Sequence, residues 1–131
     1  LDLENNLNLK KLRLYDSNIT SLKVRNKNLR KLDCHANEKL EEIDVSNCPK
    51  LETLSCYLTS LTKLNVKKNV NLRYLHCDNT GLKKLNLRKN HKLEMLKCRD
   101  TNIQKLDLSN TRISKPSALK CDPDVTVTYA E

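Results

Sequence analysis

The sequence predicts a β-rich solenoid, a stack of short coils joined by parallel strands with little or no α-helix. Two observations lead to this prediction. The template LxxLxC or LxxLxL recurs every 10 or 11 residues along the 131-residue chain. Two such half-repeats make one coil, so coils begin at residues 9, 29, 51, 72, 93 and 113, in steps of 20 to 22 residues. Self-similarity at this period is typical of stacked repeat architectures.

Each half-repeat places apolar residues at positions 1, 4 and 6. Because successive side chains of an extended segment alternate, positions 4 and 6 point to one side. One coil cannot bury that side alone, but stacked coils bury it as a continuous column. A helix is not expected, since the pattern does not continue at i+7 and i+8. We therefore expect extended or turn-like segments on both walls. The two half-repeats of coil four begin at Leu72 and Leu82.

Position 9 of the half-repeats carries short polar residues. A side chain of this kind can hydrogen-bond backbone groups that a turn leaves unpaired. We therefore expect a polar ladder at the turns, formed by Asn37, Asn69 and Asn90, with Ser17, Thr59, Thr80, Thr101 and Thr111 as substitutes.

The solenoid is predicted to span residues 1–121, about five and a half coils. LDLENN at 1–6 matches the later part of a half-repeat, as in LDLSNT at 106–111, so we expect further sequence before it. Near the other end, Pro116 stands where a leucine would be, and Leu119 and Cys121 restore positions 4 and 6. Residues 122–131 contain a turn and the alternating stretch VTVTY, and we expect a C-terminal cap strand or the start of a linker.

The stretches LEEIDVSNCPKLETLSC at 40–56 and IQKLDLSNT at 103–111 carry a family resemblance. Over residues 1–121 the sequence resembles leucine-rich repeat proteins. More narrowly, it is similar to the bacterial subclass with nested 21-residue repeats, LxxLxCxxNxLxxLDLxxN, although threonine often replaces the first-half asparagine. The resemblance implies a cell-surface or secreted bacterial protein that acts as a non-enzymatic interaction or adhesion module.

Five of the six cysteines, Cys34, Cys56, Cys77, Cys98 and Cys121, occupy position 6. Their spacing is the repeat period and not a metal-ligand spacing. Side chains in register on parallel strands point alongside one another, so we expect buried, reduced thiols rather than disulfides. Cys48 lies in the loop 46–49 and is the cysteine nearest to solvent by position, although packing inside the loop is the favoured interpretation. An extracellular location normally favours disulfides. Reduced thiols would therefore suit a surface protein of an anaerobe or a cytosolic protein.

The sequence offers no catalytic constellation. It has no nucleophile–base pair, a single glycine and therefore no phosphate-binding loop, and no metal cluster. His35 and His76 are two coils apart and in different columns, so we expect no joint site. We predict neither an enzyme nor a cofactor or metal. No long apolar run predicts a transmembrane helix or a signal peptide.

The outward positions of the two walls differ in composition. Three of the four tyrosines and two of the three histidines fall on the first-half wall, together with outward apolar residues. Such residues are favoured at protein contact surfaces. We predict a protein-binding surface formed by Tyr15, His35, Tyr57, Leu58, Tyr74, His76, Met95 and Arg99. The alternative is a structural spacer on which these residues are scattered by chance.

Charge is also uneven, within a net charge of +9. Residues 60–99 contain eleven Lys or Arg and two acids, whereas residues 29–60 contain four and six. The basic 63–99 region could attract a polyanion such as an acidic glycan. Nucleic acid is not expected, because no aromatic residues interleave with the lysines. Lysines that only keep a strand-rich solenoid soluble are the other explanation.

We expect a monomer with a protein partner.

Overall fold

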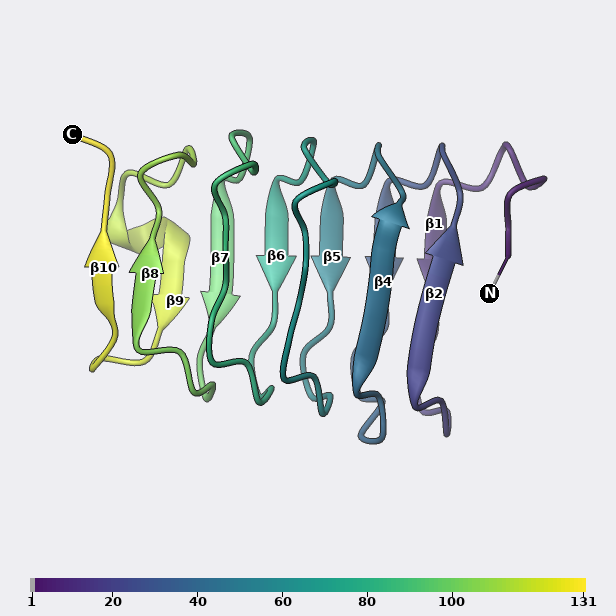
Figure 1. Cartoon of the computed structure of the whole chain (residues 1–131), viewed down its shortest axis with the longest axis horizontal. Helices are drawn as coiled ribbons and strands as arrows, with labels where there is room; N and C mark the ends of the chain where they lie inside the picture. Colours follow the sequence, from purple (N-terminus) through teal and green to yellow (C-terminus); the bar gives the residue numbers. More distant parts are fainter. Residues whose placement is uncertain (1) are drawn as a thin grey trace.

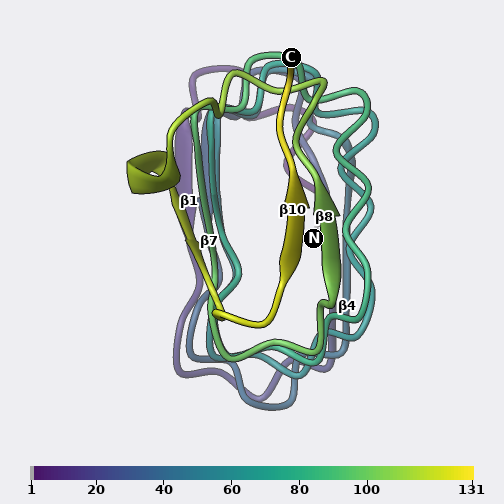
Figure 2. The same cartoon turned by 90° about the vertical axis from the view of Figure 1, so that its left-hand side faces the viewer.

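The structure, a computed structural model, describes residues 2–131. It is a solenoid of about six coils stacked along the long axis of the molecule (Figure 1). Seen along that axis, each coil is a flattened ring with two long walls (Figure 2). Leu1, predicted to belong to a partial first repeat, lies outside the described residues.

The regular elements are short strands and one turn of 3₁₀ helix. In chain order they are β1 (Lys11–Arg13), β2 (Ser21–Arg25), β3 (Lys31–Asp33), β4 (Glu42–Asn47), β5 (Thr53–Ser55), β6 (Tyr74–His76), β7 (Met95–Cys98), β8 (Lys105–Asp107), η1 (Pro116–Ala118), β9 (Leu119–Cys121) and β10 (Thr126–Thr128). None of the helical structure within residues 2–131 is long and apolar enough to cross a bilayer.

One wall is a continuous parallel sheet with the strand order β1-β3-β5-β6-β7-β9, here called the first-half sheet. Its register pairs the position-4 leucines of successive coils, which are Leu12, Leu32, Leu54, Leu75, Leu96 and Leu119. Hydrogen bonds between coils continue beyond the strand ends, as from the Leu58 amide to the Asp78 carbonyl at 3.0 Å. The predicted stack of parallel strands is therefore confirmed on this wall.

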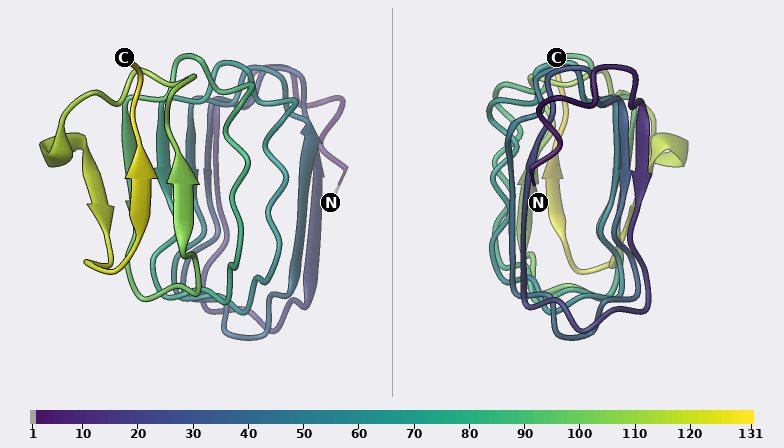
Figure 3. Two further views of the ribbon diagram at one scale, coloured as in Figure 1. Left: turned by 60° about the vertical axis from the view of Figure 1, so that its left-hand side comes forward. Right: turned by 90° about the vertical axis from the view of Figure 1, so that its right-hand side faces the viewer.

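The opposite, second-half wall is paired only near its two ends, where β2 joins β4 and β8 joins β10 (Figure 3). Between them, 61–67 and 82–88 run along the wall outside any strand. Within residues 2–131, the amides of 63–66 and 84–87 donate to no backbone carbonyl. The amides that follow these segments are paired in Asx turns. The Asn65 side chain accepts a hydrogen bond from the Lys67 amide, and the Asn86 side chain accepts one from the Arg88 amide. Extended or turn-like segments therefore form both walls, as predicted, but parallel pairing is continuous only on the first-half sheet.

The interior is filled by aliphatic side chains and thiols. The leucines that open each first half-repeat, Leu29, Leu51, Leu72 and Leu93, are fully buried. Each buried leucine contributes about 1.5–3 kcal/mol relative to an exposed one. Since no aromatic side chain of residues 2–131 is in the buried core, stability depends on unbroken leucine columns.

The position-9 residues form the expected polar ladder. The Asn37 side-chain amide donates to the carbonyls of Leu14 and Cys34 at 2.9 and 2.8 Å. Its oxygen accepts from Ser17 of the preceding coil. Thr59 and Thr80 instead donate only to the carbonyl three residues earlier. Threonine therefore satisfies the local turn, while asparagine also ties one coil to the next.

Cys48 is 0% exposed, which confirms the favoured expectation that it packs inside its loop. It occupies position 9 of its half-repeat, in the column that contains Asn69. The Cys48 thiol donates to the Val24 carbonyl at 3.4 Å, as the Asn69 amide does to the Val45 carbonyl at 2.9 Å. Cys48 thus replaces an asparagine in the ladder.

The position-6 cysteines form an internal column of free thiols. Four are buried, as predicted, whereas Cys121 at the end of the column is partly exposed. Burial raises the pKa of Cys34 and of Cys98 to about 12, with neighbouring charges adding to the effect. The thiolate form is therefore scarce at neutral pH.

Position 8 of each first half-repeat has a backbone conformation that the sequence did not reveal. Five non-glycine residues have φ between 50° and 57°, and they are Asp16, Ala36, Leu58, Asn79 and Asp100. Asp and Asn tolerate this left-handed region better than other residues. Leu58 therefore carries a backbone strain that Asn79 largely avoids.

The first prediction exchanges these two residue types. Leu58→Asn relieves the left-handed strain and is expected to raise the free energy of unfolding by roughly 1 kcal/mol. Asn79→Leu is expected to lower it by a similar amount. Urea denaturation of both variants measures the difference. Lower stability of Leu58→Asn, or unchanged stability of Asn79→Leu, would contradict the role of the left-handed φ.

The second prediction concerns alkaline pH. The folded-state pKa of about 12 for Cys34 and Cys98 exceeds the ordinary thiol value of 9.0. Between these values the folded chain binds more protons than the unfolded chain, so stability is complete below pH 9 and falls as pH rises. The fall approaches about 1.4 kcal/mol per pH unit for each thiol. Denaturation across this range should give a shallower fall for a Cys34→Ala/Cys98→Ala variant, whereas an unchanged slope would contradict the assignment.

Candidate functional site

Four aromatic rings from successive coils stack on the outer face of the first-half sheet. Tyr15 lies 6.2 Å from His35, His35 lies 4.5 Å from Tyr57, and Tyr57 lies 4.1 Å from His76, measured between ring centroids. The interplanar angles are 18°, 7° and 20°, so the rings are stacked. We call these four residues the ring column.

The ring column brings together two histidines that the sequence places in different columns of the repeat. His35 is at position 7 and His76 at position 5, so they do belong to different columns of the repeat. Tyr57 nevertheless lies between their rings, because aromatic side chains reach diagonal neighbours on a sheet face. Strand alternation gives the face on which a side chain lies but not the direction in which it leans.

An aspartate on the same coil holds each histidine. His35 Nδ1 lies 2.5 Å from Asp33 Oδ1, and His76 Nε2 lies 2.9 Å from Asp78 Oδ2. Both aspartates were missed as site residues. The signal was present in the mirrored tripeptides Asp-Cys-His at 33–35 and His-Cys-Asp at 76–78, because residues two apart on a strand share a face. These contacts fix the orientation of both imidazole rings.

Asp78 also joins the outer residues of the predicted site to the ring column. Its carbonyl accepts from the Leu58 amide at 3.0 Å, and its Oδ1 accepts from the Arg99 amide at 2.7 Å. Leu58 is 47% exposed, and the Arg99 side chain is exposed as well. Both residues therefore lie at the turn beside His76.

Tyr74 and Met95 form the other part of the predicted surface. They are direct register partners on β6 and β7, and both line a shallow hollow of about 130 Å³ that His76 also lines. Tyr74 is 38% exposed, and the Arg73 guanidinium lies 5.5 Å from the centre of its ring, a cation–π contact. Arg73 was not predicted as a site residue.

The structure thus places all eight predicted residues on one wall, although it leaves their role untested. Four of them form the ring column, two adjoin it at the turn near Asp78, and Tyr74 and Met95 lie beside His76. The hollow is smaller than the roughly 300–1,000 Å³ of typical small-molecule pockets. Within residues 2–131 no group of three or more His, Cys, Asp or Glu is placed to hold a metal. The geometry suits contact with a surface better than enclosure of a ligand.

Comparison with known proteins gives one informative match. No family model and no curated protein matches the chain. Among solved structures, the functional domain of InlJ from Listeria monocytogenes, which includes a cysteine ladder, is similar with a TM-score of 0.72 and 28% identity. The match covers 84% of this chain and 24% of the InlJ chain.

InlJ is a bacterial leucine-rich repeat protein, and its cysteine ladder has a counterpart in the position-6 thiols. This chain has the leucine-rich repeat solenoid fold. Its leucine-rich repeats agree with the nested 21-residue pattern read from the sequence. They correspond to about a quarter of the length of InlJ.

The third prediction tests the ring column as a physical unit of the leucine-rich repeat surface. Tyr57 stacks on two rings and Tyr15 on one, at a longer distance. A stacked aromatic pair contributes about 0.5–1.5 kcal/mol beyond area burial. Tyr57→Leu should therefore lower the free energy of unfolding by about 1 kcal/mol more than Tyr15→Leu, measured by urea denaturation. If the two substitutions cost the same, the stack contributes nothing measurable.

Proposed function

We propose that this chain is a protein-interaction module of a bacterial surface or secreted protein, and that it binds its partner through the first-half sheet. The observation that carries the proposal is the ring column, with Tyr74 beside it. Tyr15 is 60% exposed and Tyr74 is 38% exposed, in a chain that has only four tyrosines and no Trp or Phe. Tyrosine and arginine are enriched among residues that dominate binding energy.

The surface is organised before any partner arrives, which supports the proposal. Stacking restrains Tyr57 from both sides, and hydrogen bonds to Asp33 and Asp78 restrain the two histidines. Side chains that are already ordered lose less conformational entropy on binding. The hydrogen-bonded sheet beneath them supplies a rigid base.

The similarity to InlJ gives independent support. The ladder-bearing part of InlJ is described as a functional domain, and 84% of this chain is similar to it. We carry the bacterial surface location and the adhesion role over from this resemblance as part of the proposal.

The competing function is a structural spacer that needs only to be soluble. A spacer has no need for exposed tyrosines on one wall and not on the other. The charged second-half wall shows that the repeat also accommodates a plain polar surface. Substituting the first-half surface distinguishes the two functions, because a spacer would not lose a partner.

The fourth prediction is that a triple variant on this wall, Tyr15→Ser/Tyr74→Ser/Arg99→Ser, loses a binding partner that the unaltered chain captures. The immobilised chain is presented with extracts of bacterial and host surface proteins at low and at high salt. We expect capture that survives high salt and disappears in the variant. These three side chains were chosen because they are exposed, so that their removal leaves the fold intact.

The matched control, Arg25→Ser/Glu42→Ser/Thr62→Ser, changes three exposed residues of the second-half wall. It should retain the same partner. A partner that the first variant keeps, or that the two variants lose equally, would contradict binding through the first-half sheet.

A further inference from the structure

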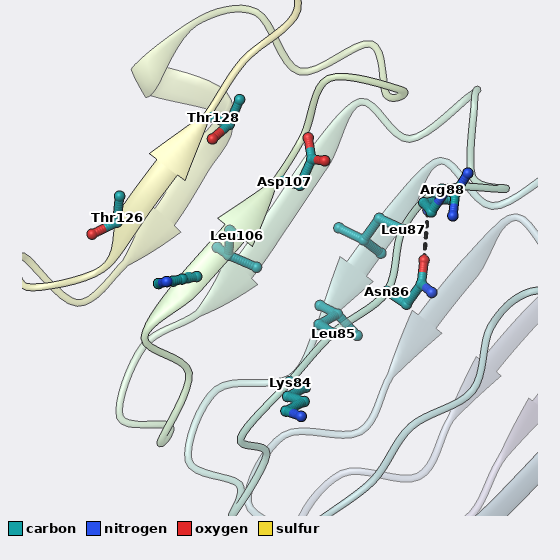
Figure 4. A pocket seen from close by; sticks show the side chains of 10 residues that line it. Lys84, Leu85, Asn86, Leu87, Arg88, Leu106, Asp107, Thr126 and Thr128 are labelled. Carbon is teal, nitrogen blue, oxygen red and sulfur yellow. Dashed lines mark hydrogen bonds between the residues drawn. The ribbon is translucent and has the colours of Figure 1, made fainter.

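The second-half wall contains hollows with cationic rims. One, of about 410 Å³, lies between 84–88 and the pair β8 and β10 (Figure 4). The apolar side chains of Leu85, Leu87 and Leu106 line it, and Lys84, Arg88 and Lys105 add their charges. A neighbouring hollow of about 400 Å³ shares Lys84 and Lys105, so the two form one surface feature. We call it the basic groove.

The solenoid repeats this charge along its axis. Lys63, Lys84 and Lys105 occupy position 3 of three successive second half-repeats, and all three are exposed. Successive coils stack along the long axis, so these lysines form a column on the second-half wall. Lys67 and Arg88 form a shorter parallel column at position 7.

These cations are not neutralised locally. Among residues 2–131, none of Lys63, Lys84 and Lys105 lies within ion-pair distance of a carboxylate. Asp107 is the one acid that lines the groove, and its Oδ1 already accepts the amide and the hydroxyl of Ser109, at 3.0 and 2.6 Å. Elsewhere the pattern differs, since Arg30 pairs with Glu52 at 2.8 Å and Arg73 with Glu94 at 3.1 Å.

The backbone adds hydrogen-bond donors to the same wall. The amides of 63–66 and 84–87 have no backbone acceptor within residues 2–131, unlike those of the first-half sheet. Cations at coil spacing beside unpaired amides suit an extended ligand that carries anionic oxygens along its length.

We propose that the basic groove binds an acidic polysaccharide, a linear chain whose sugars carry carboxylate or sulfate groups. Its anionic groups meet the lysine column and the cationic rim of the groove. A nucleic acid fits less well, because no aromatic side chain lines the groove for bases to stack on. This site is on the opposite wall from the proposed protein surface and does not depend on it.

Titration of the chain with heparin, polygalacturonate, neutral dextran and a single-stranded oligonucleotide tests the proposal. We expect binding to heparin or polygalacturonate and none to dextran. The log of the affinity should fall with the log of salt concentration with a slope of roughly −3 to −4 for five cations. Heparin binding alone would identify sulfate as the group recognised, and polygalacturonate binding would show that carboxylate suffices.

The variant Lys63→Glu/Lys84→Glu/Lys105→Glu should lose affinity on the order of 100-fold. The control Lys11→Glu/Lys31→Glu/Lys115→Glu makes the same change in net charge at exposed residues outside the groove. Its affinity for the polysaccharide should fall far less than that of the first variant. Urea denaturation of both variants checks that the fold is retained. If both variants lost the same affinity for the polysaccharide, net charge alone would explain the binding and the proposal would be overturned. An oligonucleotide that binds as tightly as heparin, or a failure of both polysaccharides to bind at low salt, would also overturn the proposal.

Discussion

The register between neighbouring coils is the constraint on which the rest of the structure depends. Parallel pairing in the first-half sheet superimposes position 4 of every coil from Leu12 to Leu119. That alignment also superimposes the buried leucines, the thiols and the position-9 ladder. A core without aromatic residues has no large side chain to fill a gap, so a shift of one residue would expose an entire column. The register partners of the first-half sheet are 20 to 23 residues apart, and the extra residues lie between its strands and leave its register unbroken.

The sequence predicted this core well because the core follows a period. Leucine spacing gave the coil boundaries, the parallel strands and the inward thiols, and position 9 gave the polar ladder. It was less informative where single residues depart from the repeat. Cys48 was expected to pack inside its loop, but its place in the asparagine column was not recognised. The left-handed φ at position 8 was missed because Asp16, Ala36 and Leu58 share no residue type that signals it.

The candidate surface shows the same limit. Alternation placed all eight predicted residues on one wall, but it could not show that Tyr57 would join His35 to His76 across two columns. Nor did it single out Asp33 and Asp78, although they hold the histidines in place. Side-chain direction and diagonal contact depend on the neighbouring coils. The first-half sheet therefore presents an ordered ring column, while the unpaired second-half wall presents charges and free amides.

This difference between the walls is the central claim, and hydrogen–deuterium exchange of backbone amides tests it most directly. In coils three and four, the amides of Cys56 and Cys77 donate to neighbouring coils at 2.9 and 2.8 Å. We expect them to exchange slowly, at rates close to those of global unfolding. The amides of 63–66 and 84–87 should exchange faster by orders of magnitude. Equal protection on the two walls would contradict the account, because both would then be hydrogen-bonded sheets.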